Sequence, residues 1–318
     1  MPDILVLSRT EVEELLNMDD AIKAMEEVFA ASSRGEADSI GVLHIDASKF
    51  GGFWSAKPGY LHKGYVGVKL GCGYPANATK GIPTTLAAVL LSDATNGLPL
   101  AVLDGVYITG VRTGATGGVA AKYLARKDSG VVGVVGTGMQ GRMQVLALKN
   151  LFKIREVRAY DIDEGRRSAY VKEMEQKMDV PVKAVNSPEA AIRGADIAIT
   201  VTPSKSAYVK NGWVADGMHI NAFGADAHGK QELEGAVYKR AKLVTDNIEV
   251  ALEKELFERK NIHAELGELI SGKKKGREGP RELTIFDSTG LGIQDVAAAS
   301  LVFEKAKKQG SGKWVKFI

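Results

Sequence analysis

The most constraining feature of this 318-residue chain is a glycine-rich turn that follows an apolar run and opens a helical segment. After Val-Val-Gly-Val-Val at 131–135 the sequence reads Gly136-Thr137-Gly138-Met139-Gln140-Gly141. In such a turn the first glycine permits a tight bend, the second lets a pyrophosphate approach the backbone, and the third lets the helix pack closely. The N–H groups at the helix N-terminus then face the phosphates. The turn predicts a Rossmann unit that binds a dinucleotide.

A carboxylate follows the next predicted strand. Asp161 comes after the strand at 156–160 and lies 20 residues beyond Gly141. There it can accept hydrogen bonds from the adenosine ribose hydroxyls and repel a 2′-phosphate. The next residue, Ile162, supplies no positive charge, and Arg166 and Arg167 lie a helical turn further on. We therefore expect NAD as the cofactor in preference to NADP.

The alternation of strands and helices from about Ser129 predicts an α/β fold with a doubly wound parallel sheet. Several of the strands are nearly continuous apolar runs, as expected when both faces of a sheet are covered. The predicted strands are 131–135, 156–160, 182–185, 196–202, 218–223, 242–246 and 283–290. The predicted helices are 139–152, 163–178, 187–194, 230–240 and 292–308.

The N-terminal part has a different texture. It begins with a short strand at 4–7, a helix capped by Ser8 with Glu11, and a helix at about 19–33. Short β-rich runs separated by turn residues then follow, which predicts an antiparallel α+β domain. These runs are 40–46, 52–56, 65–70, 85–92 and 99–104.

Composition narrows the classes of partner. The formal net charge is only +3, and the cluster at Lys273–Lys275 is interpreted as a solvated loop, so we expect no nucleic-acid or membrane partner. The single cysteine, Cys72, suits a reducing cytoplasm. The five histidines form no close ligand pair, so no metal site is expected. The N-terminus lacks the features of a signal peptide, and no segment is long and apolar enough to span a bilayer.

The sequence resembles the ornithine cyclodeaminase/mu-crystallin family and, within it, the archaeal-type alanine dehydrogenases. The resemblance covers nearly the whole chain. The segments that match the family include GVKLGCGYPAN (67–77), ITGVRTGATGG (108–118), GTGMQG, INAFGADAHGKQEL (220–233) and FDSTGLGIQDVAAA (286–299). The resemblance implies a substrate-binding and dimerisation domain at 1–125, a Rossmann domain at 126–295, and a C-terminal helix, 296–318, that packs back on the first domain. It also implies a homodimer.

The resemblance also assigns roles to residues. Lys69 matches the lysine that contacts the substrate carboxylate or carbonyl and assists proton transfer, and Asp226 matches the acid/base. Arg112 matches the arginine near substrate carboxylate and cofactor, and Thr113 the residue at the pyrophosphate. Two further residues, Lys230 and Ser288, match the nicotinamide end. The remaining candidate cofactor contacts lie at strand ends: Thr202, Phe223, Gly224 and Ala225.

Each of these residues also has a structural interpretation. Lys69 follows a strand and could be an exposed charge, Arg112 near a helix start could be solvated, and Asp226 could be an N-cap or turn residue. The expected reaction favours the functional interpretation of these residues, because an α-imino or 2-oxo acid needs a cation for its carboxylate and a placed proton donor.

One departure from the family concerns the substrate. Family members acting on small amino acids carry an arginine ahead of the motif lysine, and here Ser55 occupies that position. The candidates to take over its anion contact are Lys57, two residues on, Lys49 and His44. Alternatively, the substrate differs from alanine and carries a second polar group.

We expect an NAD-dependent amino-acid dehydrogenase or imine reductase acting on a small amino or imino acid. The alternatives are a cyclodeaminase, which needs an acidic pocket for a distal ammonium, and a non-catalytic binder of the mu-crystallin type. Only Asp46 is acidic between Ser39 and Lys69, which disfavours the first alternative. Asp161 and the retained Lys69, Arg112 and Asp226 disfavour the second.

Overall fold

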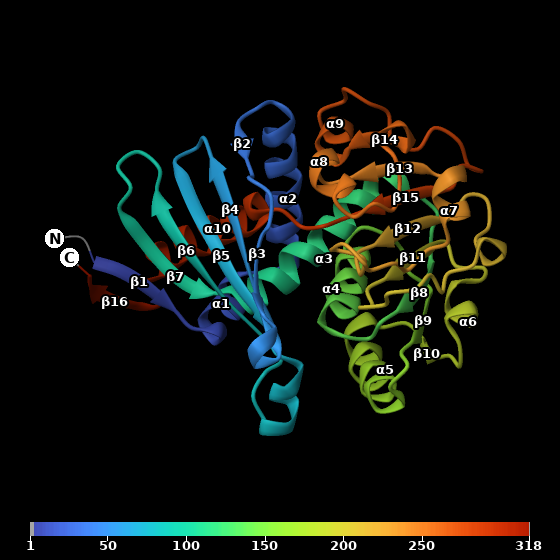
Figure 1. Ribbon diagram of the computed structural model, residues 1–318, viewed down its shortest axis with the longest axis horizontal. Coiled ribbons are helices and arrows are strands. Elements are labelled where there is room, and N and C mark those ends of the chain that lie inside the picture. The colour runs from blue at the N-terminus through green and yellow to red at the C-terminus, as the bar shows by residue number, and fades with distance from the viewer. Residues whose placement is uncertain (1–2, 318) are drawn as a thin grey trace. The chain divides into compact units, whose positions relative to one another are not determined.

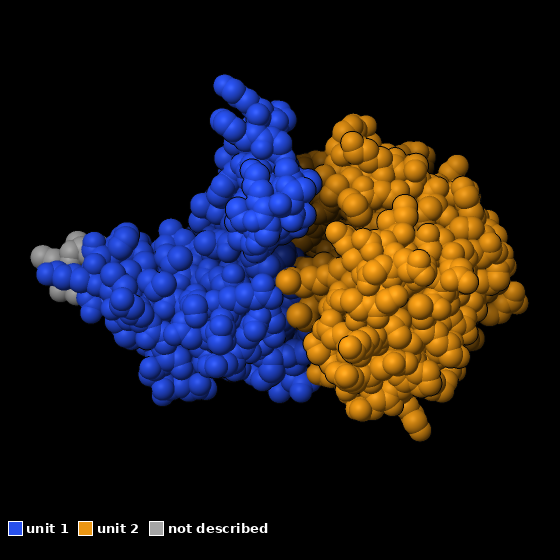
Figure 2. Space-filling view, turned by 90° about the horizontal axis from the view of Figure 1, so that it is seen from below, with its two compact units in different colours: residues 1–112, 291–318 blue, residues 113–290 orange. Residues whose placement is uncertain are grey.

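The computed structural model describes residues 3–317, which form two compact units (Figure 2). Unit 1 runs up to Arg112 and resumes at Leu291, and unit 2 comprises Thr113–Gly290. The division falls inside a continuous helix, α3 (Gly105–Leu124), between two adjacent residues. The boundaries that the family resemblance implies, after residues 125 and 295, lie later in the chain than this division.

Unit 1 is built on one mixed sheet with the strand order β16-β1-β7-β6-β5-β4-β2, and β3 pairs with β4 (Figure 1). Its antiparallel pairing was predicted correctly except at one place, because β1 pairs with β7 in parallel. The long connection between these two strands supplies the crossover that a parallel pair needs. The strands are β1 (Asp3–Leu7), β2 (Ala37–Asp38), β3 (Leu43–Ala47), β4 (Gly52–Leu61), β5 (Tyr65–Gly73), β6 (Thr85–Asp93), β7 (Pro99–Asp104) and β16 (Lys313–Lys316).

Three helices cover one face of this sheet. The first two, α1 (Arg9–Leu15) and α2 (Met18–Ser33), begin at side-chain caps, and the predicted capping box of Ser8 with Glu11 is present. The third, α10 (Gly292–Gln309), packs on β4, β5 and α2 (Figure 1). Most of the residues of α10 are buried, because the helix crosses the middle of unit 1.

Unit 2 is a doubly wound parallel sheet of order β10-β9-β8-β11-β12-β15-β13-β14 (Figure 1). The order reverses between β8 and β11, which is where such sheets bind ligands beyond their carboxyl ends. The strands are β8 (Val131–Val135), β9 (Glu156–Tyr160), β10 (Val182–Ala184), β11 (Ile197–Thr200), β12 (His219–Ala222), β13 (Lys242–Thr245), β14 (Ile262–Glu265) and β15 (Thr284–Asp287). The helices are α4 (Met139–Lys149), α5 (Glu164–Met178), α6 (Pro188–Ile192), α7 (Gly235–Arg240), α8 (Ile248–Leu252) and α9 (Leu266–Ile270).

The start of α7 differs from the prediction, and α8, β14 and α9 lie between β13 and β15, where no helix or strand was predicted. The helix predicted at 230–240 begins only at Gly235, because residues 226–234 form a loop. The strand β14 was not predicted, and it extends the sheet by pairing in parallel with β13. In the described part of the chain, no helix is long and apolar enough to cross a membrane.

The contact of β4 with the start of α10 generates a stability prediction. A Cβ atom added to Gly59 would lie 2.5 Å from the carbonyl carbon of Gly292, so the strand and helix could not keep their separation. Gly59→Ala should therefore lower the free energy of unfolding by about 1–3 kcal/mol, as overpacked cores do. Thermal or urea unfolding measures the change.

Gly71→Ala is the matched control, because it lies on the neighbouring strand and its added Cβ would meet its nearest atom, Ser55 Oγ, at an ordinary 3.6 Å. Equal unfolding free energies for the two variants would show that the close approach of β4 to α10 does not limit stability.

Candidate active site

Lys69 lies inside β5 rather than after a strand, and its side chain is buried. The pairing register places it between Lys57 on β4 and Val89 on β6. Directly opposite residues share a face of the sheet, so Lys57 and Lys69 lie on the same face. The interpretation of Lys69 as an exposed charge is therefore wrong.

Arg112 is also buried, and it lies in the middle of α3 rather than near a helix start. Its guanidinium donates from Nε to Asp295 Oδ1 at 2.9 Å and from Nη1 to Gln294 Oε1 at 2.7 Å. The interpretation of Arg112 as a solvated helix-start residue is thus wrong as well.

Asp295, on α10, joins the two predicted cations. Its side chain is fully buried, and Lys69 Nζ lies 3.1 Å from Oδ1 and 3.0 Å from Oδ2. Together with the Arg112 contact this makes a cluster, Lys69–Asp295–Arg112, in which one carboxylate separates two positive groups. Sequence analysis missed Asp295 and Gln294. The available signal was that Asp295 is the only charged residue in the apolar stretch 291–303.

The cluster shifts the pKa values of its members. Burial lowers the pKa of Lys69 to about 7, Asp295 opposes that shift, and Arg112 and Lys57 reinforce it. Burial alone would raise the pKa of Asp295, but the charges of Arg112, Lys69 and Lys57 outweigh it and hold that pKa below its ordinary value. Asp295 is therefore ionised at neutral pH, while Lys69 can either give or take a proton.

In unit 2 the glycine-rich turn has the geometry of a phosphate cradle. Gly136 adopts φ +102°, and a Cβ there would lie 2.6 Å from the carbonyl oxygen of Val201. A Cβ at Gly141 would lie 2.2 Å from the carbonyl oxygen of Gly136, whereas one at Gly138 would meet nothing within 4 Å. Gly138 is the N-cap of α4 and places no side chain over the helix N-terminus. The turn therefore leaves room for a pyrophosphate beside free N–H groups.

Asp161 is tied to this turn. Its Oδ2 accepts from Thr137 N at 2.8 Å and from Thr137 Oγ1 at 2.9 Å, and Oδ1 accepts from Asp163 N at 3.0 Å. Burial raises the pKa of Asp161, but these hydrogen bonds outweigh it and hold the pKa below its usual value. The adjacent Ile162 is 93% exposed. The carboxylate is thus a fixed negative charge at the end of β9.

The two arginines near Asp161 pair with acids of their own helix, Arg166 with Asp163 at 3.6 Å and Arg167 with Glu164 at 3.8 Å. A third arginine, Arg142 of α4, was missed by sequence analysis. It donates to the carbonyl oxygens of Thr137 and Gly138 and pairs with Glu173 at 2.6 Å, so it braces the turn.

The other predicted residues of unit 2 lie at the ends of β11, β12 and β15. Thr202 and the segment Phe223–Ala225 follow β11 and β12. Asp226 is exposed and pairs with Lys230 at 2.6 Å. Ser288 is buried and donates to Asp246 at 2.7 Å. Thr113, on α3, is also buried.

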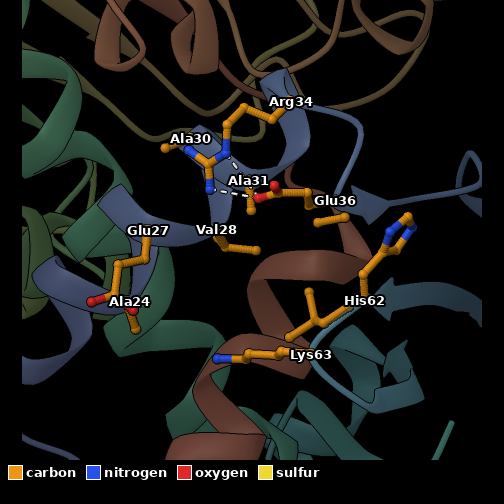
Figure 3. Close-up of a pocket in the computed structure, with 11 residues that line it drawn as sticks. Ala24, Glu27, Val28, Ala30, Ala31, Arg34, Glu36, His62 and Lys63 are labelled. Atoms are coloured by element: carbon orange, nitrogen blue, oxygen red, sulfur yellow. Dashed lines mark hydrogen bonds and ion pairs between the residues drawn. The ribbon is translucent and has the colours of Figure 1, made fainter. Parts of the chain in front are cut away.

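A separate pocket of about 600 Å³ lies in unit 1 between α2 and the β4–β5 turn (Figure 3). Alanines and Val28 form much of its lining, and Arg34 pairs with Glu36 at its rim at 2.6 Å. It contains none of the predicted site residues. Within residues 3–317, no group of three or more His, Cys, Asp or Glu side chains could hold a metal ion.

Comparison with known proteins extends over the whole chain. Residues 3–310 match the model of the ornithine cyclodeaminase/mu-crystallin family. An alanine dehydrogenase of Archaeoglobus fulgidus is 43% identical over 99% of both chains. A solved archaeal alanine dehydrogenase dimer with bound NAD superimposes with a TM-score of 0.93, 42% identity and complete coverage of both chains. The Thermococcus litoralis Δ1-pyrroline-2-carboxylate reductase, solved with NADH and L-proline, gives a TM-score of 0.93 and 37% identity over 98% of this chain and 100% of that one.

The cluster geometry makes a prediction that needs no assay of activity. Asp295→Asn removes the negative charge that raises the pKa of Lys69, so that pKa should fall below about 7. The pH dependence of Lys69 acetylation by a small anhydride, followed by peptide mass spectrometry, measures it. Asp38→Asn is the control, because Asp38 is exposed and pairs with His62. An unchanged or raised pKa of Lys69 in Asp295→Asn would contradict the electrostatic account.

Proposed function

The chain belongs to the ornithine cyclodeaminase/mu-crystallin family, and we propose that it is an NAD-dependent amino-acid dehydrogenase or imine reductase. It would transfer hydride between NAD(H) and the α-carbon of a small 2-imino or 2-oxo acid. The observation that carries this proposal is the buried Lys69–Asp295–Arg112 cluster, in a chain 43% identical to an alanine dehydrogenase. A second relative, 37% identical, is a Δ1-pyrroline-2-carboxylate reductase solved with L-proline, which favours imine reduction as part of the same activity.

The cluster suits a substrate carboxylate. Arg112 is held by Asp295 and Gln294, so its guanidinium is oriented before an anion arrives. Lys57 faces Lys69 across β4 and β5, and its charge acts on both Lys69 and Asp295. We assign Lys57 to the anion contact that the family's arginine makes. With Lys57, the site has three cationic side chains against the single carboxylate of Asp295, which favours binding of an anionic substrate.

The same cluster supplies a proton. A lysine with a pKa of about 7 is present in both forms at neutral pH. In reduction, Lys69 can therefore give a proton to the imine nitrogen or the oxo oxygen as hydride adds to the α-carbon. It can take the proton back in the reverse direction. Asp226 is assigned as a second acid/base, and in the absence of ligand its carboxylate pairs with Lys230 at 2.6 Å. Bound NADH supplies the hydride.

Unit 2 is assigned to NAD. Gly136 and Gly138 shape the cradle, the N-terminus of α4 faces the pyrophosphate, and Asp161 accepts from the adenosine ribose. The strand ends are assigned to the nicotinamide half, with Thr202, Gly224, Lys230 and Ser288 among the contacts. Thr113 is assigned to the pyrophosphate. Unit 1 is assigned to the substrate and to dimerisation.

The alternatives are less well supported. A cyclodeaminase requires a carboxylate for a distal ammonium, and Asp46, the only acidic residue between Ser39 and Lys69, is exposed and bonded to Ser48. A non-catalytic binder would have no need for a buried lysine with a pKa of about 7. A cytoplasmic location remains part of the proposal, and the single cysteine supports it.

The catalytic assignment is tested by reduction of 2-oxo acids with ammonia or methylamine, and of Δ1-pyrroline-2-carboxylate, with NADH and NADPH. Wild type should prefer NADH. Lys69→Ala and Asp226→Asn should each lower kcat by about 10²–10⁴ while NADH still binds. Arg112→Ala should raise KM for the oxo or imino acid and weaken the binding of NADH.

Lys63→Ala is the control, because Lys63 lies in the turn after β4, away from the cluster. Values of kcat within a few-fold of wild type for both Lys69→Ala and Asp226→Asn would refute their roles, and the absence of any NADH-dependent reduction by wild type would refute the function itself.

The face of the unit 1 sheet opposite Lys69 generates a prediction about assembly. The pairing register places a set of large apolar side chains on that one face, and each is at least 39% exposed. They are Leu43, Ile45, Trp54, Leu70, Leu86 and Leu90. An exposed apolar face of this kind marks a protein–protein interface, and the archaeal alanine dehydrogenase relative is a dimer. We propose a homodimer formed through this face.

Light scattering should give twice the 34.0 kDa chain mass for wild type. Leu70→Glu should shift the protein to monomer, because it would bury a charge in the interface. Trp314→Glu, which changes an exposed apolar residue on the edge strand β16, should leave the dimer intact. A monomeric wild type, or a dimeric Leu70→Glu variant, would contradict the assignment.

A further inference from the structure

Unit 2 contains a buried acid that the proposed mechanism does not use. Glu232 is fully buried, with a relative accessibility of 0%. Burial raises its pKa, and hydrogen bonds from Thr202 and Tyr208 oppose that shift. Among residues 3–317 the structure pairs its carboxylate with no cation. Such a group is costly to bury, so its surroundings must compensate with hydrogen bonds.

Four hydrogen bonds reach the carboxylate, and they come from three segments of the chain. Oε1 accepts from Thr202 N at 2.7 Å, from Thr202 Oγ1 at 2.7 Å and from Tyr208 OH at 2.8 Å. Oε2 accepts from Gly224 N at 2.9 Å. Two of the four donors are backbone N–H groups, which cannot accept, and they lie on different oxygens. The arrangement therefore requires an acceptor at both oxygen positions, which a carboxylate offers and an amide does not.

The segments joined in this way are the ends of two neighbouring strands. Thr202 follows β11, which pairs with β8, the strand that leads into the glycine-rich turn, and Gly224 follows β12, which pairs with β11. They pack so closely that a Cβ at Gly224 would lie 2.3 Å from the carbonyl oxygen of Thr202. Val201, one residue before Thr202, contacts Gly136 of the turn. The carboxylate thus fixes backbone that continues directly into the cradle.

We propose that Glu232 is a positioning residue for the cofactor: its carboxylate sets the spacing of the Thr202 and Gly224 strand ends, and through them the seat of the nicotinamide half of NAD. The inference rests on the proposed function, which assigns those strand ends to NAD. The adenosine half is assigned to Asp161 and Gly138, whereas the hydrogen-bond partners of the Glu232 carboxylate are Thr202, Tyr208 and Gly224. Loss of the carboxylate should therefore affect one half of the dinucleotide and spare the other.

The main chain of Glu232 allows the side chain to be tested separately. Its carbonyl oxygen accepts from Tyr208 N and Val209 N, both at 2.9 Å, and these bonds do not depend on the carboxylate. In Glu232→Gln the loop backbone therefore keeps its anchor, but an NH₂ group replaces one acceptor oxygen. Either Thr202 N or Gly224 N then faces a donor and is left without a partner.

The test compares the affinities of purified full-length protein for two ligands by isothermal titration calorimetry. NADH contains both halves of the dinucleotide, and ADP contains the adenosine and phosphates but no nicotinamide riboside. Glu232→Gln should lower the affinity for NADH by about tenfold or more, because one buried donor is left unpaired. It should change ADP affinity by less than about twofold, because the adenosine site is separate. Glu234→Gln is the matched control, since Glu234 caps Asn211 N and pairs with Lys210, and it should change neither affinity.

Equal weakening of NADH and ADP by Glu232→Gln would overturn the proposal in favour of a general structural role, and unchanged NADH affinity would overturn it outright. If Glu232→Gln does not fold, Tyr208→Phe decides, because it removes one donor from the carboxylate without placing a donor against a donor. It should weaken NADH by a few-fold and spare ADP, and unchanged NADH binding would reject the role. Failure of wild type to bind NADH would instead reject the proposed function.

Discussion

The site in unit 1 depends on one ionised carboxylate, that of Asp295, held between two buried cations. Without it, Lys69 and Arg112 would be like charges in a desolvated interior, and burial would drive the lysine further toward its neutral form. With it, the Arg112 guanidinium is oriented, and Lys69, with a pKa of about 7, is close to half protonated at neutral pH. The fold serves this contact, because Gly59 and Gly292 let β4 and α10 approach closely enough to bring Asp295 against β5.

Unit 2 uses buried carboxylates in a related way, as acceptors that gather backbone N–H groups at strand ends. Glu232 joins the ends of β11 and β12. Asp246 accepts from Ser288 Oγ, Thr289 N and Gly290 N, and so fixes the turn after β15. In both cases the acid replaces water as the partner of backbone groups that would otherwise be buried unpaired. Hydrogen bonds within the protein therefore connect the strand ends at the edge of the sheet where doubly wound folds bind ligands.

The sequence predicted most of unit 2, because apolar strand runs, the glycine-rich turn and Asp161 are local signals. It predicted the family, and it singled out Lys69 and Arg112 as candidates without predicting which residues surround them. Asp295 and Glu232 act through contacts with residues far away in the chain, which no local pattern encodes. The same reason explains the missed parallel pairing of β1 with β7 and the misplaced start of α7, since both depend on tertiary partners.

The central claim is that this chain reduces a carboxylate-bearing C=N or C=O carbon by hydride transfer from NADH. The most direct measurement follows deuterium from (4R)- and (4S)-[4-²H]NADH into product formed from pyruvate and ammonium, read by NMR. The account predicts that one of the two labelled cofactors places a single deuterium at the α-carbon of one alanine enantiomer. Racemic product, or consumption of NADH without deuterium at that carbon from either cofactor, would contradict it.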